Sequence, residues 1–239
     1  FGRAAFMKEK KDARELATAM VDASNRCGIK TSAVLTTMDQ PIGSAIGNSL
    51  EILESIETMR GNGPWDLEEL VCAQGGELLH ATGIAKDAEI GFVMIQDSLH
   101  DGSALQCFIQ MAESQGVDSS VFESEHSLCL ALGLLDPELN TTEIASSISG
   151  TVSDIDAMKL ALVALDLGAG RKKIDDVIDH SVGFLLNVEL GQSIEEGEIW
   201  ITAHHRGQLS NKMVEKIKQS IQITDSDFEP ESRIHEWIR

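Results

Sequence analysis

The sequence is poor in aromatic residues and in basic charge. It has no tyrosine, and Phe, Trp and Tyr together make up 4% of its 239 residues. Lys and Arg number 19 against 39 Asp and Glu, which gives a formal net charge of −20 at pH 7. Nucleic-acid binding depends on clustered Lys and Arg that contact phosphates, so we expect no nucleic-acid partner. The acidic surface is typical of a solubility feature.

Long apolar runs and paired cysteines are also missing. No apolar stretch approaches the ~20 residues that cross a bilayer and no signal-peptide pattern is visible, so we expect no membrane association. The cysteines are widely spaced and form no Cys-x-x-Cys pair; they are Cys27, Cys72, Cys107 and Cys129. This scatter predicts free thiols in a reducing compartment rather than a zinc site or a disulfide framework. A cytoplasmic location is the expectation.

One stretch organises the rest of the chain. The β-branched and apolar run Thr31–Thr37 predicts a strand, and it is followed by a loop that contains Pro41, Gly43 and Gly47. A helix is predicted to begin near Asn48, a residue type that suits the N-cap. Its buried stripe would consist of Leu50, Leu53 and Ile56.

This strand–loop–helix connection admits two chemical interpretations and one structural one. Backbone groups at such a connection face outward, and free amides suit an anion. Carbonyls backed by a carboxylate such as Glu54 suit a hard cation. The simpler interpretation is that the glycines serve turn geometry only, and spacing alone favours it.

The first half of the chain alternates helices with a strand, a pattern that predicts a layered α/β domain. The predicted elements are a helix at Glu9–Arg26, a strand at Lys30–Thr37 and helices at Asn48–Arg60, Trp65–His80, Lys86–Leu99 and Ser103–Gln115. The helix at Lys86–Leu99 is expected to bury Ile90, Val93 and Met94. Residues Gly116–Asn140 have no clean period and are predicted to cross between two subdomains.

The second half changes character. Strands are predicted at Thr142–Ser149 and Thr151–Ile155, followed by a helix at Asp156–Leu167. The glycines that come next could cradle an anion, but phosphate cradles precede helices, so a C-terminal cap is favoured. Hairpins around residues 181–205 resemble half of a lipoyl- or biotin-carrier barrel, although the carrier lysine has no counterpart. His204 and His205 are assigned to a polar strand end. A last helix at Ser210–Ile221 precedes a predicted polar, frayed tail.

Several separated motifs together point to one family. The segments are Thr31–Thr36, Met38–Gly43, Gly47–Glu51, Leu167–Arg171, Asp176–Asp179 and Val182-Gly183. In this order they resemble the pyrimidine-nucleoside and thymidine phosphorylases. Residues Phe1–Lys8 are similar to the family's Gly-x-Gly-Ala-Phe-Met segment, from which Arg3 and Ala4 depart. The resemblance implies the C-terminal part of a layered α/β phosphorylase domain (residues 1–118), a crossing segment (119–141) and a smaller α+β domain with barrel-sandwich-like hairpins (142–239).

The resemblance also implies an activity. Family members catalyse the reversible phosphorolysis of thymidine, deoxyuridine or uridine, with inorganic phosphate as co-substrate, to a free base and a (deoxy)ribose 1-phosphate. The resemblance implies a homodimer. It places a potassium ion at the carbonyls of Ile42 and Ala45 and the carboxylate of Glu54, and it places Phe6 beside the pyrimidine base. Plain core burial is the alternative for Phe6.

No catalytic residue is assigned within the chain. The family's phosphate- and base-holding residues match positions before Phe1, so we expect this chain to be a C-terminal fragment that is inactive alone. Two alternatives belong to other classes of protein. One is a stand-alone carrier-like binding module, and the other is a non-catalytic scaffold.

Overall fold

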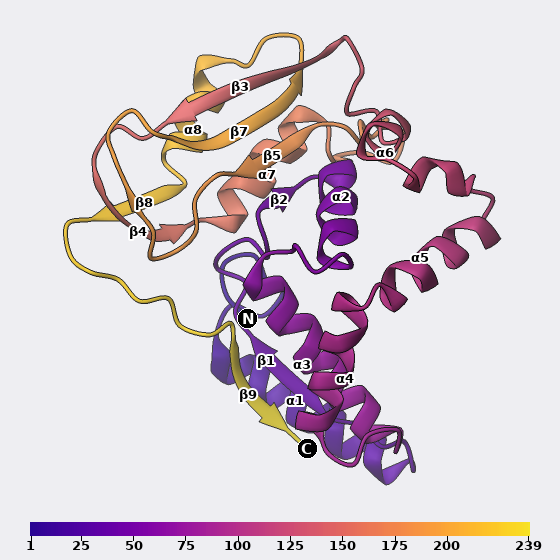
Figure 1. Ribbon diagram of the computed structural model, residues 1–239. Coiled ribbons are helices and arrows are strands. Elements are labelled where there is room, and N and C mark those ends of the chain that lie inside the picture. Colours follow the sequence, from indigo (N-terminus) through magenta and orange to yellow (C-terminus); the bar gives the residue numbers. More distant parts are fainter.

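The computed structural model describes residues 1–239, and its elements form two groups (Figure 1). The lower group in the view consists of α1 (Lys10–Arg26), β1 (Ala33–Thr36), α3 (Trp65–Ala81), α4 (Ala88–His100) and β9 (Ile234–Ile238). The upper group holds β2 (Ala45–Ile46), α2 (Asn48–Thr58), β3 (Leu139–Ala145), β4 (Gly150–Ile155), α7 (Ala157–Leu167), β5 (Gly183–Leu186), β6 (Ser193–Ile194), β7 (Ile199–Arg206), α8 (Asn211–Lys218) and β8 (Ile221–Thr224). The connection on one side is made by α5 (Ser103–Ser114), η1 (Ser119–Phe122) and α6 (Glu125–Ala131).

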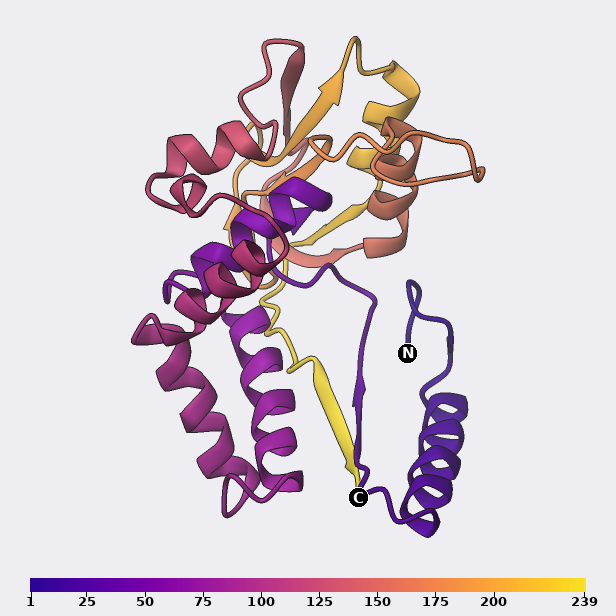
Figure 2. The same ribbon diagram turned by 90° about the vertical axis from the view of Figure 1, so that its right-hand side faces the viewer.

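The lower group is layered, as predicted. Strands β1 and β9 pair antiparallel and lie between α1 on one side and the α3–α4 pair on the other (Figure 2). Helices α3 and α4 approach closely where Gly76 faces Gly91. A Cβ on Gly76 would lie 2.5 Å from the backbone nitrogen of Phe92, so only glycine permits this approach. None of the helices combines the length with the apolar composition that a membrane span requires.

The prediction of a polar, frayed tail is wrong. Residues Ile234–Ile238 form β9, which pairs with β1 in a register that sets Ala33 opposite Ile238. Arg239 pairs with Glu77 of α3 at 2.8 Å, which ties the end of the strand to the helix layer. The partner strand lies about 200 positions earlier in the chain. Local patterning therefore gives no sign of this pairing, which depends on long-range contacts.

The upper group has its own core. A four-stranded sheet of order β2-β5-β7-β3 and a three-stranded sheet of order β6-β4-β8 enclose it together with α7 and α8. Its largest fully buried side chains include Trp200, Phe184, Leu160 and Ile217. These antiparallel hairpins agree with the predicted α+β part. Strand β2 belongs to this sheet although it lies early in the chain, because it pairs with β5.

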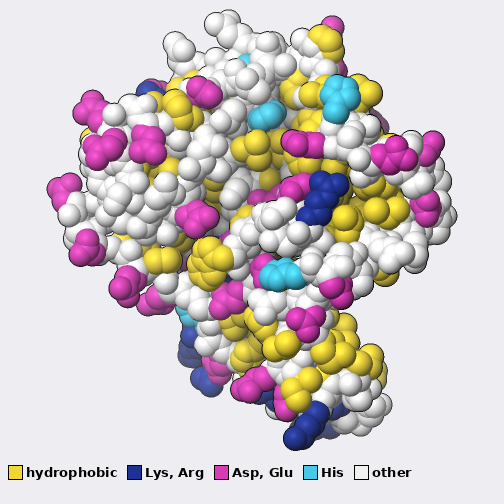
Figure 3. Space-filling model, in the orientation of Figure 1, with side chains coloured by type: hydrophobic (Ala, Val, Ile, Leu, Met, Phe, Trp, Pro, Cys, Tyr) yellow, Lys and Arg dark blue, Asp and Glu magenta, His cyan; other side chains and the backbone are white.

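Two further expectations are corrected. The segment predicted to cross between two subdomains contains η1 and α6, two elements not predicted from the sequence, and the Ser124 hydroxyl caps α6 by accepting from the Ser127 amide. Helix α6 is seven residues long, too short to display a helical period. The face of α4 predicted to be buried is open: Ile90, Val93 and Met94 are 45%, 51% and 42% exposed. Figure 3 shows hydrophobic side chains gathered over this helical part of the molecule. An apolar stripe thus marks a contact face without identifying what covers it.

Candidate functional site

The predicted site lies in the loop that joins β1 to β2 and α2. Gly47 is the N-cap of α2, and Asn48 is the first helical residue, so the assignment of Asn48 as the cap is wrong. Gly47 approaches the backbone at Gly183, where a Cβ would lie 2.5 Å from the Val182 carbonyl oxygen. The Asn48 side chain instead donates to the Ala169 carbonyl at 2.9 Å. These contacts fix the helix against the upper group.

Glu54 turns from α2 back onto the loop. Its Oε1 accepts hydrogen bonds from the backbone amides of Ser44 at 2.7 Å and Ala45 at 3.0 Å. Burial raises the pKa of the Glu54 carboxyl above its ordinary value, the two amides oppose this rise, and the nearby carboxylates of Asp66 and Glu51 add to it. Both loop amides use Oε1, so Oε2 is available to another ligand. A positive charge at this position would favour the ionised carboxylate.

Strand geometry directs the Ala45 peptide groups toward Glu54. Leu186 donates its amide to the Ser44 carbonyl at 2.8 Å, so Ser44 faces β5. Alternate residues of an antiparallel pair point to opposite edges. The N–H and C=O of Ala45 therefore face away from β5, where the N–H meets Glu54.

The three predicted potassium ligands lie together. Ile42, Ala45 and Glu54 line one cavity with Met38, Pro41 and Glu51. The Ile42 carbonyl oxygen accepts no hydrogen bond from any backbone or side-chain donor. Unused carbonyl oxygens beside a carboxylate are a donor set that suits a hard, weakly hydrated cation. The residues present therefore fit such an ion.

Phe6 lies outside this cavity. Its side chain is 93% exposed, so the alternative of plain core burial is wrong. The segment that carries it is nevertheless fixed against the loop, because Met38 donates its amide to the Phe1 carbonyl at 2.8 Å and Ala4 donates to Met38 at 3.2 Å. The role of Phe6 beside a base stays a prediction.

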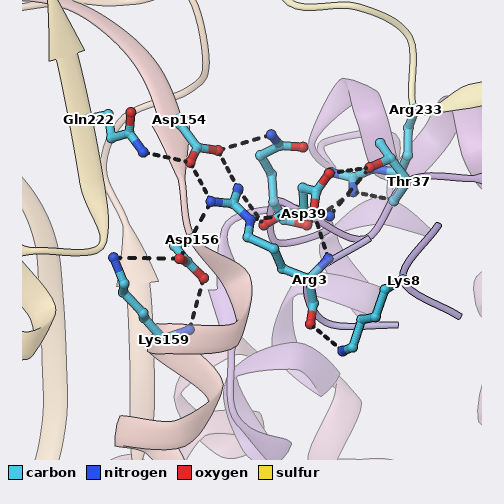
Figure 4. A network of polar contacts seen from close by, with 10 residues as sticks. Arg3, Lys8, Thr37, Asp39, Asp154, Asp156, Lys159, Gln222 and Arg233 are labelled. Carbon is cyan, nitrogen blue, oxygen red and sulfur yellow. Dashed lines mark hydrogen bonds and ion pairs between the residues drawn. The ribbon is translucent and has the colours of Figure 1, made fainter. Parts of the chain in front are cut away.

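Arg3 forms a network that the sequence does not reveal. Its two Nη atoms each contact one carboxylate oxygen of Asp154 at 2.7 Å, and Nη1 lies 3.4 Å from Asp156 (Figure 4). On the other side, the Arg3 amide donates to Asp39 at 2.7 Å. The hydrogen bonds with Asp154 raise the pKa of the guanidinium, against its partial burial. Arg3 thus joins the predicted loop to β4 and the start of α7. In the sequence it was only a departure from a glycine motif.

Two smaller predictions have clear outcomes. Gly168 caps α7 with a φ of +107°, which confirms the cap interpretation of the glycines after this helix. The two histidines lie near the end of β7, as predicted, because this strand finishes at Arg206. His205 is buried and its Nε2 lies 2.8 Å from the Thr142 hydroxyl.

Comparisons with known proteins agree with this architecture. Residues 1–105 match a family model described as the glycosyl transferase family, a/b domain. Residues 151–224 match the pyrimidine nucleoside phosphorylase C-terminal domain. The fold and the two matches define a glycosyltransferase-type α/β domain followed by a phosphorylase C-terminal domain.

The relatives narrow the class to one family. A pyrimidine-nucleoside phosphorylase of Staphylococcus haemolyticus is 37% identical over 237 residues, and one of Geobacillus stearothermophilus is 35% identical over the same length. Both alignments cover 99% of this chain. The chain belongs to the pyrimidine-nucleoside phosphorylase family. It spans about half the length of these relatives, since the alignments cover 53% of each.

Proposed function

We propose that the complete protein that contains this chain catalyses the reversible phosphorolysis of pyrimidine nucleosides. The observation that carries the proposal is the 37% identity that extends over 99% of the chain and so includes both matched domains. The substrates are thymidine, deoxyuridine or uridine together with inorganic phosphate. The protein is accordingly a pentosyltransferase of nucleoside salvage, and we propose a cytoplasmic homodimer.

The reaction sets requirements that this chain meets in part. Phosphate attacks the anomeric carbon, the glycosidic C–N bond breaks, and the base leaves with developing negative charge. Stabilising that charge requires preorganised donors at the base and the phosphate. We assign none of these donors to this chain. Its contribution is to hold a rigid loop beside the reaction site, fixed by Glu54 from α2 and by Arg3 from the N-terminal segment.

We further propose that the loop binds potassium through the carbonyls of Ile42 and Ala45 and the carboxylate of Glu54. When bound, the ion supplies a fixed positive charge that favours an adjacent anion such as phosphate. Support comes from the shared cavity, the unused Ile42 carbonyl oxygen and the free Oε2 of Glu54. Gly43 also supports the proposal, because the Glu54 carboxylate lies so close to it that a Cβ at this position would overlap the carboxylate.

The activity is tested by incubating the complete protein with each nucleoside, with and without phosphate. We expect a free base to appear only with phosphate, and we expect this chain alone to be inactive. A complete protein without turnover on any pyrimidine nucleoside contradicts the proposal. Turnover by this chain alone would show that donors were wrongly assigned outside it.

The potassium site is tested by comparing Glu54→Gln with Glu57→Gln. Glu57 lies one turn further along α2 and pairs with Arg60 at 2.6 Å, so its variant is a matched control. We expect the first variant alone to lose the rise in melting temperature that potassium gives the wild type. Equal responses of both variants to potassium would rule out Glu54 as a ligand.

A further inference from the structure

The C-terminal segment places a buried guanidinium against the predicted loop. The Arg233 side chain is 8% exposed. Its Nη1 donates to the carbonyls of Thr37 at 3.2 Å and Gln40 at 3.1 Å. Its Nη2 donates to the carbonyl of Pro41 at 2.6 Å and to Asp66 at 3.0 Å. One side chain therefore donates to three carbonyl oxygens of the loop backbone and to one carboxylate.

Asp66 extends this contact to the next part of the loop. The same Oδ2 that pairs with Arg233 accepts the amide of Gly43 at 3.2 Å. The peptide units on both sides of Ile42 are thus held, the first through the Pro41 carbonyl and the second through the Gly43 amide. Asp66 lies in the first turn of α3, so the anchor belongs to the lower group of elements.

The surroundings make these bonds difficult to replace. Arg233 and Asp66 line a cavity of about 70 Å³ whose apolar walls include Leu186, Val188 and Leu190. Without the guanidinium, the three loop carbonyls would lose a charged hydrogen-bond donor. The Arg233 Nε is itself buried with no hydrogen-bond partner. The guanidinium is therefore oriented for its Nη contacts with the loop, and its fifth donor, the Nε–H, makes no hydrogen bond.

Separate parts of the chain hold the loop. Glu54 of α2 fixes the amides of Ser44 and Ala45, whereas Arg233 of the C-terminal segment and Asp66 of α3 fix backbone groups of residues 37–43. Figure 4 shows Arg233 reaching Thr37 while Arg3 holds Asp39 of the same loop. The Ile42 carbonyl lies between the two sets of contacts.

We propose that Arg233 is a positioning residue that orients the Ile42 carbonyl for cation binding. The proposal rests on the proposed function, because it concerns the potassium loop of that enzyme. It makes the C-terminal segment part of the cation site although it contributes no ligand. Lysine cannot replace arginine here, since a single ammonium cannot bridge two Nη positions in a planar fork.

The experiment uses the complete protein with Arg233→Lys and, as a control, Arg239→Gln. Arg239 lies in the same C-terminal segment but pairs with Glu77, away from the loop. Hydrogen exchange of peptides covering residues 37–46 is measured by mass spectrometry over a range of potassium concentrations, and phosphorolysis is measured in parallel. Loop exchange reports on cation binding without depending on catalysis.

We expect Arg233→Lys to raise the potassium concentration for half-maximal protection of the loop by about 10- to 100-fold, as removal of a group that orients a metal ligand does. Saturating potassium should restore kcat. Arg239→Gln should require the same potassium concentration for half-maximal protection as the wild type. If Arg233→Lys does not fold, Asp66→Asn weakens the same anchor and should shift the potassium dependence in the same direction.

The outcomes separate this proposal from the function. Equal potassium dependence in Arg233→Lys and Arg239→Gln would overturn the positioning role alone. If the hydrogen exchange of the wild-type loop does not change with potassium concentration, both the cation site and the positioning role are overturned. A potassium dependence of loop exchange that Arg233→Lys shifts and Arg239→Gln does not, in a protein without phosphorolysis, would support the positioning role and contradict the proposed function.

Discussion

Replacing Gly43 by alanine tests how closely the Glu54 carboxylate packs on the loop. Gly43 has a φ of +67°, and a Cβ built there would lie 2.8 Å from the Glu54 carboxyl carbon and still closer to Oε2. Gly28 is a matched control, because its φ is +82° and a Cβ there meets no atom within 4 Å. Both substitutions impose the left-handed conformation on alanine, and only Gly43→Ala also displaces Glu54.

The magnitudes follow from these two contributions. A left-handed alanine costs about 1 kcal/mol, which is the whole effect expected for Gly28→Ala. Displacing Glu54 weakens two hydrogen bonds from amides to a charged acceptor, each of which contributes about 1.5–3 kcal/mol when fully lost. Partial relaxation and hydration of the carboxylate reduce this to about 2 kcal/mol in all. We therefore expect Gly43→Ala to destabilise the protein by about 3 kcal/mol.

Urea unfolding followed by tryptophan fluorescence measures the difference. The same pair of variants is then made in a Glu54→Ala background, where Gly43→Ala should cost no more than Gly28→Ala. Equal destabilisation by the two glycine substitutions in the wild-type background would refute the packing of Glu54 on the loop, and with it the geometry of the predicted cation site.

Three other substitutions give distinct outcomes. Arg3→Met should destabilise by about 2 kcal/mol, because it leaves the partly buried Asp154 with glutamine donors but without an opposite charge, and urea unfolding checks this value. Trp200→Ala should cost about 3–5 kcal/mol, since this side chain is fully buried in the upper core; a smaller loss would contradict that burial. Arg206 lowers the pKa of Asp179 against the effect of burial, so the stability this pair gives is present above the ordinary carboxyl pKa and is lost as the pH falls through the lowered value. Arg206→Met should therefore lower the melting temperature at pH 7 and reduce its fall on acidification, and an unchanged pH profile would contradict the pair.

The sequence was informative where signals are local. Helix boundaries at residues 10–26, 65–81 and 157–167 follow from apolar periodicity and from capping residues such as Asp156 and Gly168. The grouping of Ile42, Ala45 and Glu54 came from the family resemblance, and a helix that starts just after the loop gives Glu54 a short path back to it.

Long-range contacts were not accessible in the same way. The pairing of β9 with β1, and the Arg233 contacts with the loop, join residues nearly 200 positions apart. No periodicity or spacing rule links such segments, because the contact exists only after both parts have folded. Exposure was misjudged for α4 for a related reason, since an amphipathic stripe does not identify its partner.

The central proposal is that the complete protein containing this chain splits pyrimidine nucleosides with phosphate. Its most direct test is chromatographic detection of free uracil or thymine when the complete protein is incubated with uridine or thymidine. We predict release of the base that requires phosphate and yields one equivalent of (deoxy)ribose 1-phosphate for each base. Release without phosphate, or no release from either nucleoside, would contradict the claim.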